Sequence, residues 1–179
     1  MKTFDLAEAS ADFDALFASA RRTMFKAEAL QDYSAVDDLP SLHAWLAGDE
    51  QKAKELGKQD AGVTAWRERC LASPAKITRV HVVREPRTPY LDWEIEVIYK
   101  GSLLASGAED VRIAPASKLG DAKLPAGDFW IFDGQKVLHW QYEDGVGKTI
   151  GATVWGEHDD ISEFLKLRET LLSAAQPVV

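Results

Sequence analysis

Residues 128–155 read DFWIFDGQKVLHWQYEDGVGKTIGATVW, and this stretch decides the fold class that the sequence predicts. It contains three short runs rich in β-branched and aromatic residues, which are DFWIF, KVLHWQY and KTIGATVW. DGQ separates the first two runs, and EDGVG separates the second from the third. Since Asp-Gly pairs favour the tight turns of β-hairpins, the stretch predicts a three-stranded antiparallel meander.

Strand patterns also precede the meander, and a helix pattern follows it. KITRVHVVRE, residues 76–85, alternates so that both faces are partly apolar, and EDVRIAP, residues 109–115, is another short strand-like run. DDISEFLKLRETLLSAA, residues 159–175, has the spacing of an amphipathic helix. We therefore expect a sheet of about five strands, mainly antiparallel, closed by a C-terminal helix.

The first part of the chain is typical of helices. In ADFDALFASARRTMFKAEAL, residues 11–30, apolar residues recur at helical spacing over the whole segment. PSLHAWLAGD, residues 40–49, has proline in the first turn and glycine near the end, as short helices often do. EQKAKELGKQD, residues 50–60, is either a solvated loop or an exposed helical turn, and GVTAWRERCLA, residues 62–72, resumes a helix.

The change of pattern after Pro74 marks a boundary within one compact domain. A chain of 179 residues with 46% hydrophobic residues is of ordinary single-domain size. We predict an α+β domain over residues 1–179, in which a helical portion, 1–73, packs on a sheet portion, 74–179. The strand order does not follow from the sequence.

Composition and charge limit the expected partners. The formal net charge is −8 and the pI is about 5.0, whereas general affinity for nucleic acid or anionic membranes needs clustered Lys and Arg. We therefore expect no direct nucleic-acid partner and no membrane partner, and a cytoplasmic monomer or homodimer. The single cysteine, Cys70, excludes an internal disulfide and is expected to be a buried small hydrophobe.

No sequence motif predicts a cofactor or a metal. The four histidines fall in four different expected elements, without the HxxxH or CxxC spacing that presents two ligands locally, so no metal site is predicted. GVGKT, residues 145–149, lacks the earlier glycine of a phosphate loop and precedes a strand, so it is expected to be a hairpin turn.

One polar stretch could form a ligand site. In RVHVVREPRTPYLDWE, residues 79–94, Arg84 and Glu85 stand at the end of an expected strand, and Tyr90 and Glu94 are one helical turn apart if a helix follows. An arginine fork suits a carboxylate or phosphate, and nearby Glu and Tyr side chains could orient it. The alternative is an Arg–Glu ion pair that joins the strand end to the next element.

The order of these segments resembles a domain-of-unknown-function family of actinobacteria that often lies beside helix-turn-helix regulators. The resemblance covers about Phe13 to Pro177, and its sharpest parts are RVHVVREPRTPYLDWE and the DFW that opens the meander. Residues 89–101 fit a strand or a helix equally well, and the family pattern implies a helix from Tyr90 to Tyr99. Residues that match the family's polar and aromatic pattern are Arg79, Arg84, Glu85, Tyr90, Glu94, Asp110, Asp128, Trp130 and Asp133.

These features favour one function and leave two alternatives. The first is a non-enzymatic regulatory or interaction protein whose acidic surface binds a helix-turn-helix regulator. The second is a sensor or enzyme for a small anionic ligand, with a pocket around Arg84, Tyr90 and Glu94. The third is an acidic antitoxin-type component. The ligand-binding candidates are Arg79, Arg84, Glu85, Tyr90, Glu94, Asp128 and Trp130.

Overall fold

A computed structural model of the chain describes residues 1–35, 37–143 and 147–178. Its centre is a sheet with eight strands among these residues, in the order β1-β7-β6-β5-β2-β3-β4-β8. The strands are β1 (Lys2–Asp5), β2 (Thr23–Glu28), β3 (Lys76–Val83), β4 (Asp110–Pro115), β5 (Phe129–Phe132), β6 (Lys136–Tyr142), β7 (Thr149–Trp155) and β8 (Gln176–Pro177).

The sheet is mixed. β2 pairs with β3 and β3 with β4 in parallel, and the other described neighbours are antiparallel. The α+β class is confirmed, whereas the expected sheet of about five mainly antiparallel strands was too small. The β5-β6-β7 meander is confirmed. Residues 144–146, within the EDGVG turn and the GVGKT segment, lie outside the described residues.

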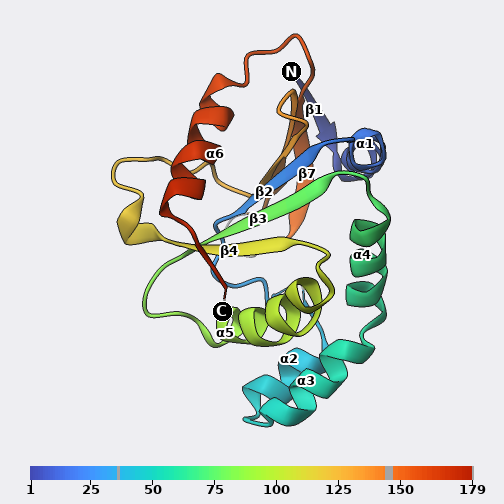
Figure 1. The fold of residues 1–179 in the computed structure, drawn as a ribbon, viewed down its shortest axis with the longest axis vertical. Coiled ribbons are helices and arrows are strands. Elements are labelled where there is room, and N and C mark those ends of the chain that lie inside the picture. Colours follow the sequence, from blue (N-terminus) through green and yellow to red (C-terminus); the bar gives the residue numbers. More distant parts are fainter. Residues whose placement is uncertain (36, 144–146, 179) are drawn as a thin grey trace.

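Helices cover both faces of the sheet (Figure 1). α1 and α4 pack on one face through Phe17 and Cys70, and α6 packs on the other through Leu171. Cys70 is buried, as expected. The helices are α1 (Leu6–Ser19), α2 (Pro40–Leu46), α3 (Glu50–Gln59), α4 (Ala61–Ala72), α5 (Pro89–Trp93), the π-helix η1 (Glu94–Leu104), the 3₁₀ turn η2 (Ala116–Lys118) and α6 (Ser162–Ala174).

The expected helix over residues 11–30 is wrong in its second half. α1 ends at Ser19, and Thr23–Glu28 forms strand β2 in the middle of the sheet. Both faces of β2 are covered, because Met24 packs in the core under α1 and Phe25 in the core under α6. The predicted division into a helical portion, 1–73, and a sheet portion is therefore wrong, since β1 and β2 belong to the sheet.

The chain is helical from Tyr90 to Tyr99, as the family pattern implies. It is an α-helix up to Trp93 and a π-helix from Glu94 onward. Thr88 caps α5, because its hydroxyl accepts a hydrogen bond from the Leu91 backbone N–H. The chain then runs into η1, whose buried residues face the sheet and α3. α5 and η1 close the end of the sheet on the side where α2 and α3 lie (Figure 1).

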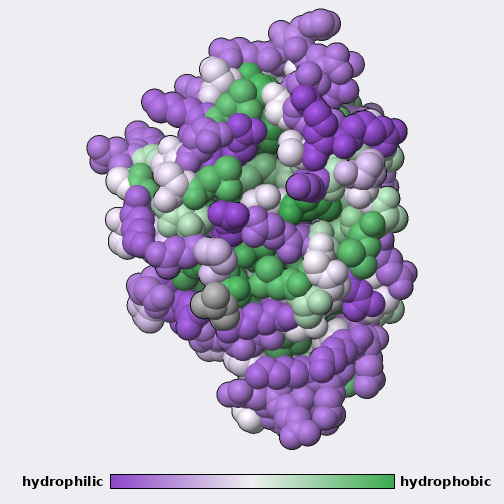
Figure 2. Space-filling view, viewed as in Figure 1, coloured by the Kyte–Doolittle hydropathy of each residue, from purple (hydrophilic) through white to green (hydrophobic). Residues whose placement is uncertain are grey.

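Hydrophilic and hydrophobic residues are unevenly distributed over the surface. On the face shown in Figure 2, the end formed by α2 and α3 is hydrophilic, while hydrophobic residues gather over the middle of the molecule. Within the described parts of the chain, no helix has both the length and the apolar character that a membrane crossing requires.

Candidate functional site

The register of the central strands places charged side chains in rows. Lys26 of β2 is paired with Arg79 of β3 on one side and with Trp130 of β5 on the other. Glu28 is paired with His81. Because alternate residues of a strand share a face, these side chains lie on the face that α1 and α4 cover. The strands thus bury a charged cluster beside the aromatic core.

Arg79 is the centre of this cluster. It is 7% exposed, its Nε donates to Glu109 Oε2 at 2.7 Å, and its Nη1 donates to Glu28 Oε1 at 2.8 Å. Its Nη2 donates to Glu109 Oε1 at 2.9 Å, and Trp66 Nε1 donates to the same oxygen at 2.6 Å. Burial alone would raise the pKa of Glu109, but Arg79 and Trp66 outweigh it and lower that pKa.

Lys26 extends the cluster toward β5. Its Nζ pairs with Glu28, lies 3.8 Å from Asp128 Oδ2, and stands 5.7 Å from the centre of the Trp130 ring. The Tyr33 hydroxyl donates to Asp128 at 2.8 Å. Burial, together with the Glu28 carboxylate, raises the pKa of Asp128. The carboxylates of Glu28, Asp128 and Glu109 therefore hold Lys26 and Arg79 in place.

A pocket of about 420 Å³ opens onto these two cations. Its lining is mainly aromatic and aliphatic and comes from α1, α4, η1 and the sheet. The charged residues of this lining are Arg79, which is buried, and Lys26 and Asp60, which are partly buried. Arg79 carries five N–H groups, of which its described partners accept three, so two remain for an acceptor. The aromatic walls are Phe13, Trp66, Trp130 and Trp140.

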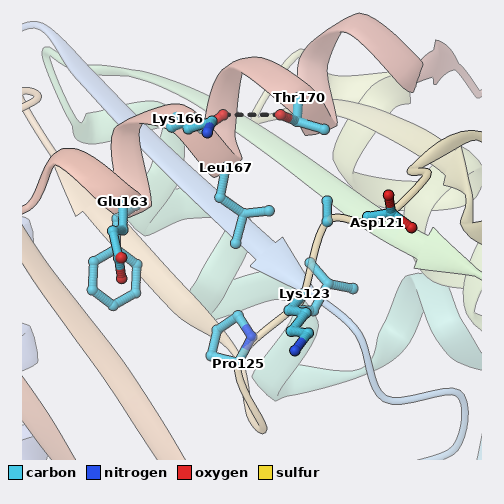
Figure 3. A pocket seen from close by; sticks show the side chains of 10 residues that line it. Asp121, Lys123, Pro125, Glu163, Lys166, Leu167 and Thr170 are labelled. Carbon is cyan, nitrogen blue, oxygen red and sulfur yellow. Dashed lines mark hydrogen bonds between the residues drawn. The ribbon is translucent and has the colours of Figure 1, made fainter.

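A larger cavity of about 630 Å³ lies between α6 and the loop at residues 121–125 (Figure 3). Leu167 points into it, and the charged side chains of Asp121, Lys123, Glu163 and Lys166 lie around it. The Thr170 hydroxyl donates to a carbonyl of its own helix (Figure 3). The described residues bring no buried charged group to this cavity, so the smaller pocket is the better candidate site.

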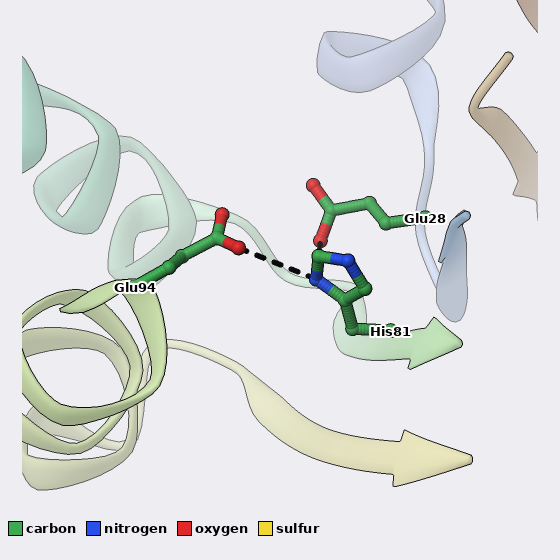
Figure 4. A group of neighbouring side chains, drawn as sticks. All are labelled: Glu28, His81 and Glu94. Atoms are coloured by element: carbon green, nitrogen blue, oxygen red, sulfur yellow. Dashed lines mark ion pairs between the residues drawn. The ribbon is translucent and has the colours of Figure 1, made fainter. Parts of the chain in front are cut away.

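A second buried group adjoins the cluster. Glu28, His81 and Glu94 come from β2, β3 and the first residue of η1, and their side chains converge (Figure 4). His81 Nδ1 lies 2.8 Å from the Tyr99 hydroxyl and 3.3 Å from Glu94 Oε2. Burial alone would lower the pKa of His81, but the Glu94 and Glu28 carboxylates raise it to about 9.

Four of the predicted site residues meet around this polar core. Arg79 and Glu94 belong to the two buried groups just described, and Asp128 and Trp130 contact Lys26. The structure thus brings together residues that the sequence placed in separate segments.

The other three predicted residues lie elsewhere. Arg84 is exposed and donates to the Ala29 carbonyl at 3.3 Å, and Glu85 accepts a local backbone N–H. Tyr90 is buried and donates to Asp37 at 2.6 Å. Arg84, Tyr90 and Glu94 line no common pocket among those found in the described chain, and the Arg84 ion pair is absent from its described contacts.

Sequence reasoning missed several members of the site, which are Lys26, Glu28, Trp66, His81, Tyr99 and Glu109. A signal was present in MFKAE, residues 24–28, where charged residues alternate with apolar ones. That alternation is typical of a strand with a polar row on one face.

Comparisons with known proteins give a family and a distant likeness. No curated protein matches the chain. One solved structure that the chain resembles is that of TrmBL2, an archaeal chromatin protein described as showing a novel mode of DNA binding. The two chains share 14% sequence identity, and the TM-score is 0.42. The match covers 99% of this chain, which spans about half (54%) of that protein.

The expectation of no direct nucleic-acid partner is corrected by this match, because it rested on net charge alone and the matched protein binds DNA. At this TM-score the likeness supplies no argument that the present chain binds DNA. The match to a family model is much more extensive, since it covers residues 11–179. The chain belongs to the family described as a domain of unknown function, DUF6879.

Proposed function

We propose that this domain binds a small molecule, without catalysing a reaction, in the pocket above Lys26 and Arg79. The observation that carries the proposal is the buried Arg79 guanidinium, which still has N–H groups to offer at the bottom of a mainly apolar pocket. Each Arg79 nitrogen already has one acceptor, and a ligand oxygen could accept from the two N–H groups that remain. The described lining residues include no serine, cysteine or histidine.

The lining also indicates the class of ligand. Aromatic walls favour an apolar or aromatic ring, because ring pairs and buried apolar area both contribute to binding. The donors of Lys26 and Arg79 favour a carboxylate or carbonyl oxygen at one end of that ring. An ammonium group carries only donors, so it offers no acceptor to the N–H groups of Lys26 and Arg79.

Three matched probes test this reading. The probes are 3-phenylpropionate, 3-phenylpropionamide and 3-phenylpropylamine, which share a ring and differ in the terminal group. Isothermal titration calorimetry should detect binding of the carboxylate and the amide, with the amine at least about tenfold weaker. Equal binding of the amine, or heat from none of the three, would contradict the proposal.

A pair of tryptophan substitutions locates the binding. Val63 on α4 lines the pocket, whereas Ala65 on the same helix is exposed and does not. Val63→Trp should fill the pocket and abolish probe binding, and Ala65→Trp should leave it unchanged. Loss in both variants, or in neither, would place the probe elsewhere. The helix-turn-helix partner expected from the sequence stays a prediction, which a pull-down with such a regulator would test.

A further inference from the structure

Glu28, His81 and Glu94 form a second buried group, and none of the three lines the pocket. One ligand atom from each lies within 4.8 Å of the others, and the three residues are 3%, 0% and 7% exposed. They come from two neighbouring strands and from the start of η1, so the fold fixes their relative positions (Figure 4).

The orientation of His81 is set by a backbone carbonyl. His81 Nε2 lies 2.8 Å from the Leu30 oxygen, and a carbonyl oxygen can only accept, so Nε2 carries the hydrogen. The other ring nitrogen, Nδ1, then faces Glu94 Oε2 at 3.3 Å and Glu28 Oε2 at 3.6 Å. Nδ1 also lies 2.8 Å from the Tyr99 hydroxyl, but that hydroxyl donates its hydrogen to Glu28 Oε2 and so does not satisfy the Nδ1 lone pair. A lone pair facing two carboxylate oxygens is unfavourable unless a positive charge lies between them. A backbone carbonyl on the second ring nitrogen is also the usual arrangement for a metal-binding histidine.

Glu94 is the second, independent indication. Its Oε2 is buried, and no described residue satisfies it with a hydrogen bond. Glu94 opens the π-helix, in which residues five apart lie close to one face, and Tyr99 accordingly points at the same group.

The charges of the whole buried cluster leave room for a dication. Its carboxylates are those of Glu28, Glu94, Glu109 and Asp128, whereas its fixed cations are Lys26 and Arg79. When His81 is neutral, as a histidine that binds a metal must be, four negative charges face two positive ones. A single divalent cation beside His81 would balance them.

We propose that Glu28, His81 and Glu94 bind a divalent transition-metal ion, with Zn²⁺ as the first candidate. Imidazole nitrogen with carboxylate oxygen suits Zn²⁺ better than Mg²⁺ or Ca²⁺, which prefer oxygen alone. Bonds of about 2.0–2.2 Å in a tetrahedral site place ligand atoms roughly 3.3–3.6 Å apart. The distances from His81 Nδ1 to Glu94 Oε2 and Glu28 Oε2, 3.3 and 3.6 Å, agree with that geometry. Tyr99, whose hydroxyl donates to Glu28 Oε2 at 2.8 Å, would orient that ligand.

The test begins with metal content. Protein without a histidine tag, purified without chelator, should hold about one Zn²⁺ per chain by inductively coupled plasma mass spectrometry. Because the group is buried, an ion enters during folding, so protein refolded from denaturant with EDTA should have a lower Tm than protein refolded with Zn²⁺. Glu94→Gln should weaken Zn²⁺ binding at least about tenfold. Glu96→Gln, two residues along η1 and paired only with Lys100 in the described chain, should leave binding unchanged.

Two results would overturn the proposal. One is a wild-type protein that contains no metal and whose Tm after refolding is the same with Zn²⁺ and EDTA; a proton on His81 would then supply the charge. The other is equal Zn²⁺ binding by the two glutamine variants. If Glu94→Gln does not fold, X-ray absorption of the wild-type Zn²⁺ protein decides, since only nitrogen and oxygen neighbours are expected, and sulfur would place the ion at Cys70.

Discussion

Replacing Arg79 with methionine tests whether the charged cluster is held together by this one cation. The substitution keeps a long buried side chain and removes three charge-assisted hydrogen bonds of 2.7–2.9 Å. Glu28 keeps Lys26 and Tyr99, but Glu109, which is 3% exposed, keeps only the Trp66 N–H and the Cys70 thiol. Stranding one buried carboxylate costs about 3–5 kcal/mol.

Urea unfolding followed by tryptophan fluorescence at pH 7 measures this loss in the free energy of unfolding. Arg79→Met combined with Glu109→Gln should recover at least about 2 kcal/mol, because the stranded charge is gone and the amide oxygen still accepts from Trp66. As a control, Arg112→Met breaks a pair with Asp110 at the surface and should cost at most about 0.5 kcal/mol. A cost below about 1 kcal/mol for Arg79→Met, or strictly additive effects in the double variant, would refute the reasoning.

The same substitution has a pH signature. The pKa of Glu109 is lowered in the folded protein, so its contribution to stability is present above its unfolded pKa of about 4.3 and is lost as pH falls through the folded value. Without Arg79, burial dominates and raises that pKa, so the variant's penalty shrinks once Glu109 protonates. The gap between wild type and Arg79→Met should therefore narrow from pH 7 toward pH 4.

Three further predictions concern the scaffold around the site. Asp133→Ala should lower the free energy of urea unfolding by about 2 kcal/mol, because the Asp133 carboxylate accepts hydrogen bonds from three successive backbone N–H groups at the start of β2. The backbone of Asp133 has φ +51°, a conformation that asparagine tolerates, so Asp133→Asn should cost less. Gly127→Ala, at φ +99°, would overlap the Trp140 carbonyl oxygen, so calorimetry should show a much larger fall in Tm than for Gly120→Ala, which has a positive φ but open space. Burial and the Glu109 carboxylate raise the pKa of Cys70 to about 12, so a thiol reagent should label it only in denaturant.

Elements with a strong local signal could be predicted from the sequence. The β5–β6 hairpin follows from the Asp-Gly turn between its strands, and its register pairs Trp130 with Leu138. α6 and α4 likewise follow from apolar spacing within one segment. In each case the residues that determine the element lie within about twenty positions of one another.

Strand β2 could not be predicted from the local sequence pattern. Its apolar residues fit the helical period that begins in α1, so the segment was assigned to one long helix. Its strand character depends on parallel pairing with β3, where Thr23 lies opposite Lys76. Three helices separate these strands in sequence, and the pairing is set by packing across the domain rather than by residues near Thr23.

The error in β2 also explains the error in the site. A helix over residues 11–30 gives no reason to expect Lys26 and Glu28 beside Arg79 and His81. The sequence therefore favours the local cluster of Arg84, Glu85 and Tyr90 as the site. In the folded chain, the charged cluster is formed by alternate residues of the paired strands β2 and β3, and not by the turn that follows β3. Arg79 and Glu94 were identified because their own segment was polar, not because their partners were known.

Glu28 decides how the two proposed sites can be separated. Its Oε1 faces Arg79 and Lys26 at the bottom of the pocket, and its Oε2 faces Tyr99 and His81. A Glu28 substitution therefore perturbs both sites and identifies neither. Val63 and Glu94 each touch one site only, which makes them the informative positions. Because the sites share a carboxylate, a change that Zn²⁺ causes in the affinity for 3-phenylpropionate must equal, by thermodynamic reciprocity, the change that 3-phenylpropionate causes in the affinity for Zn²⁺.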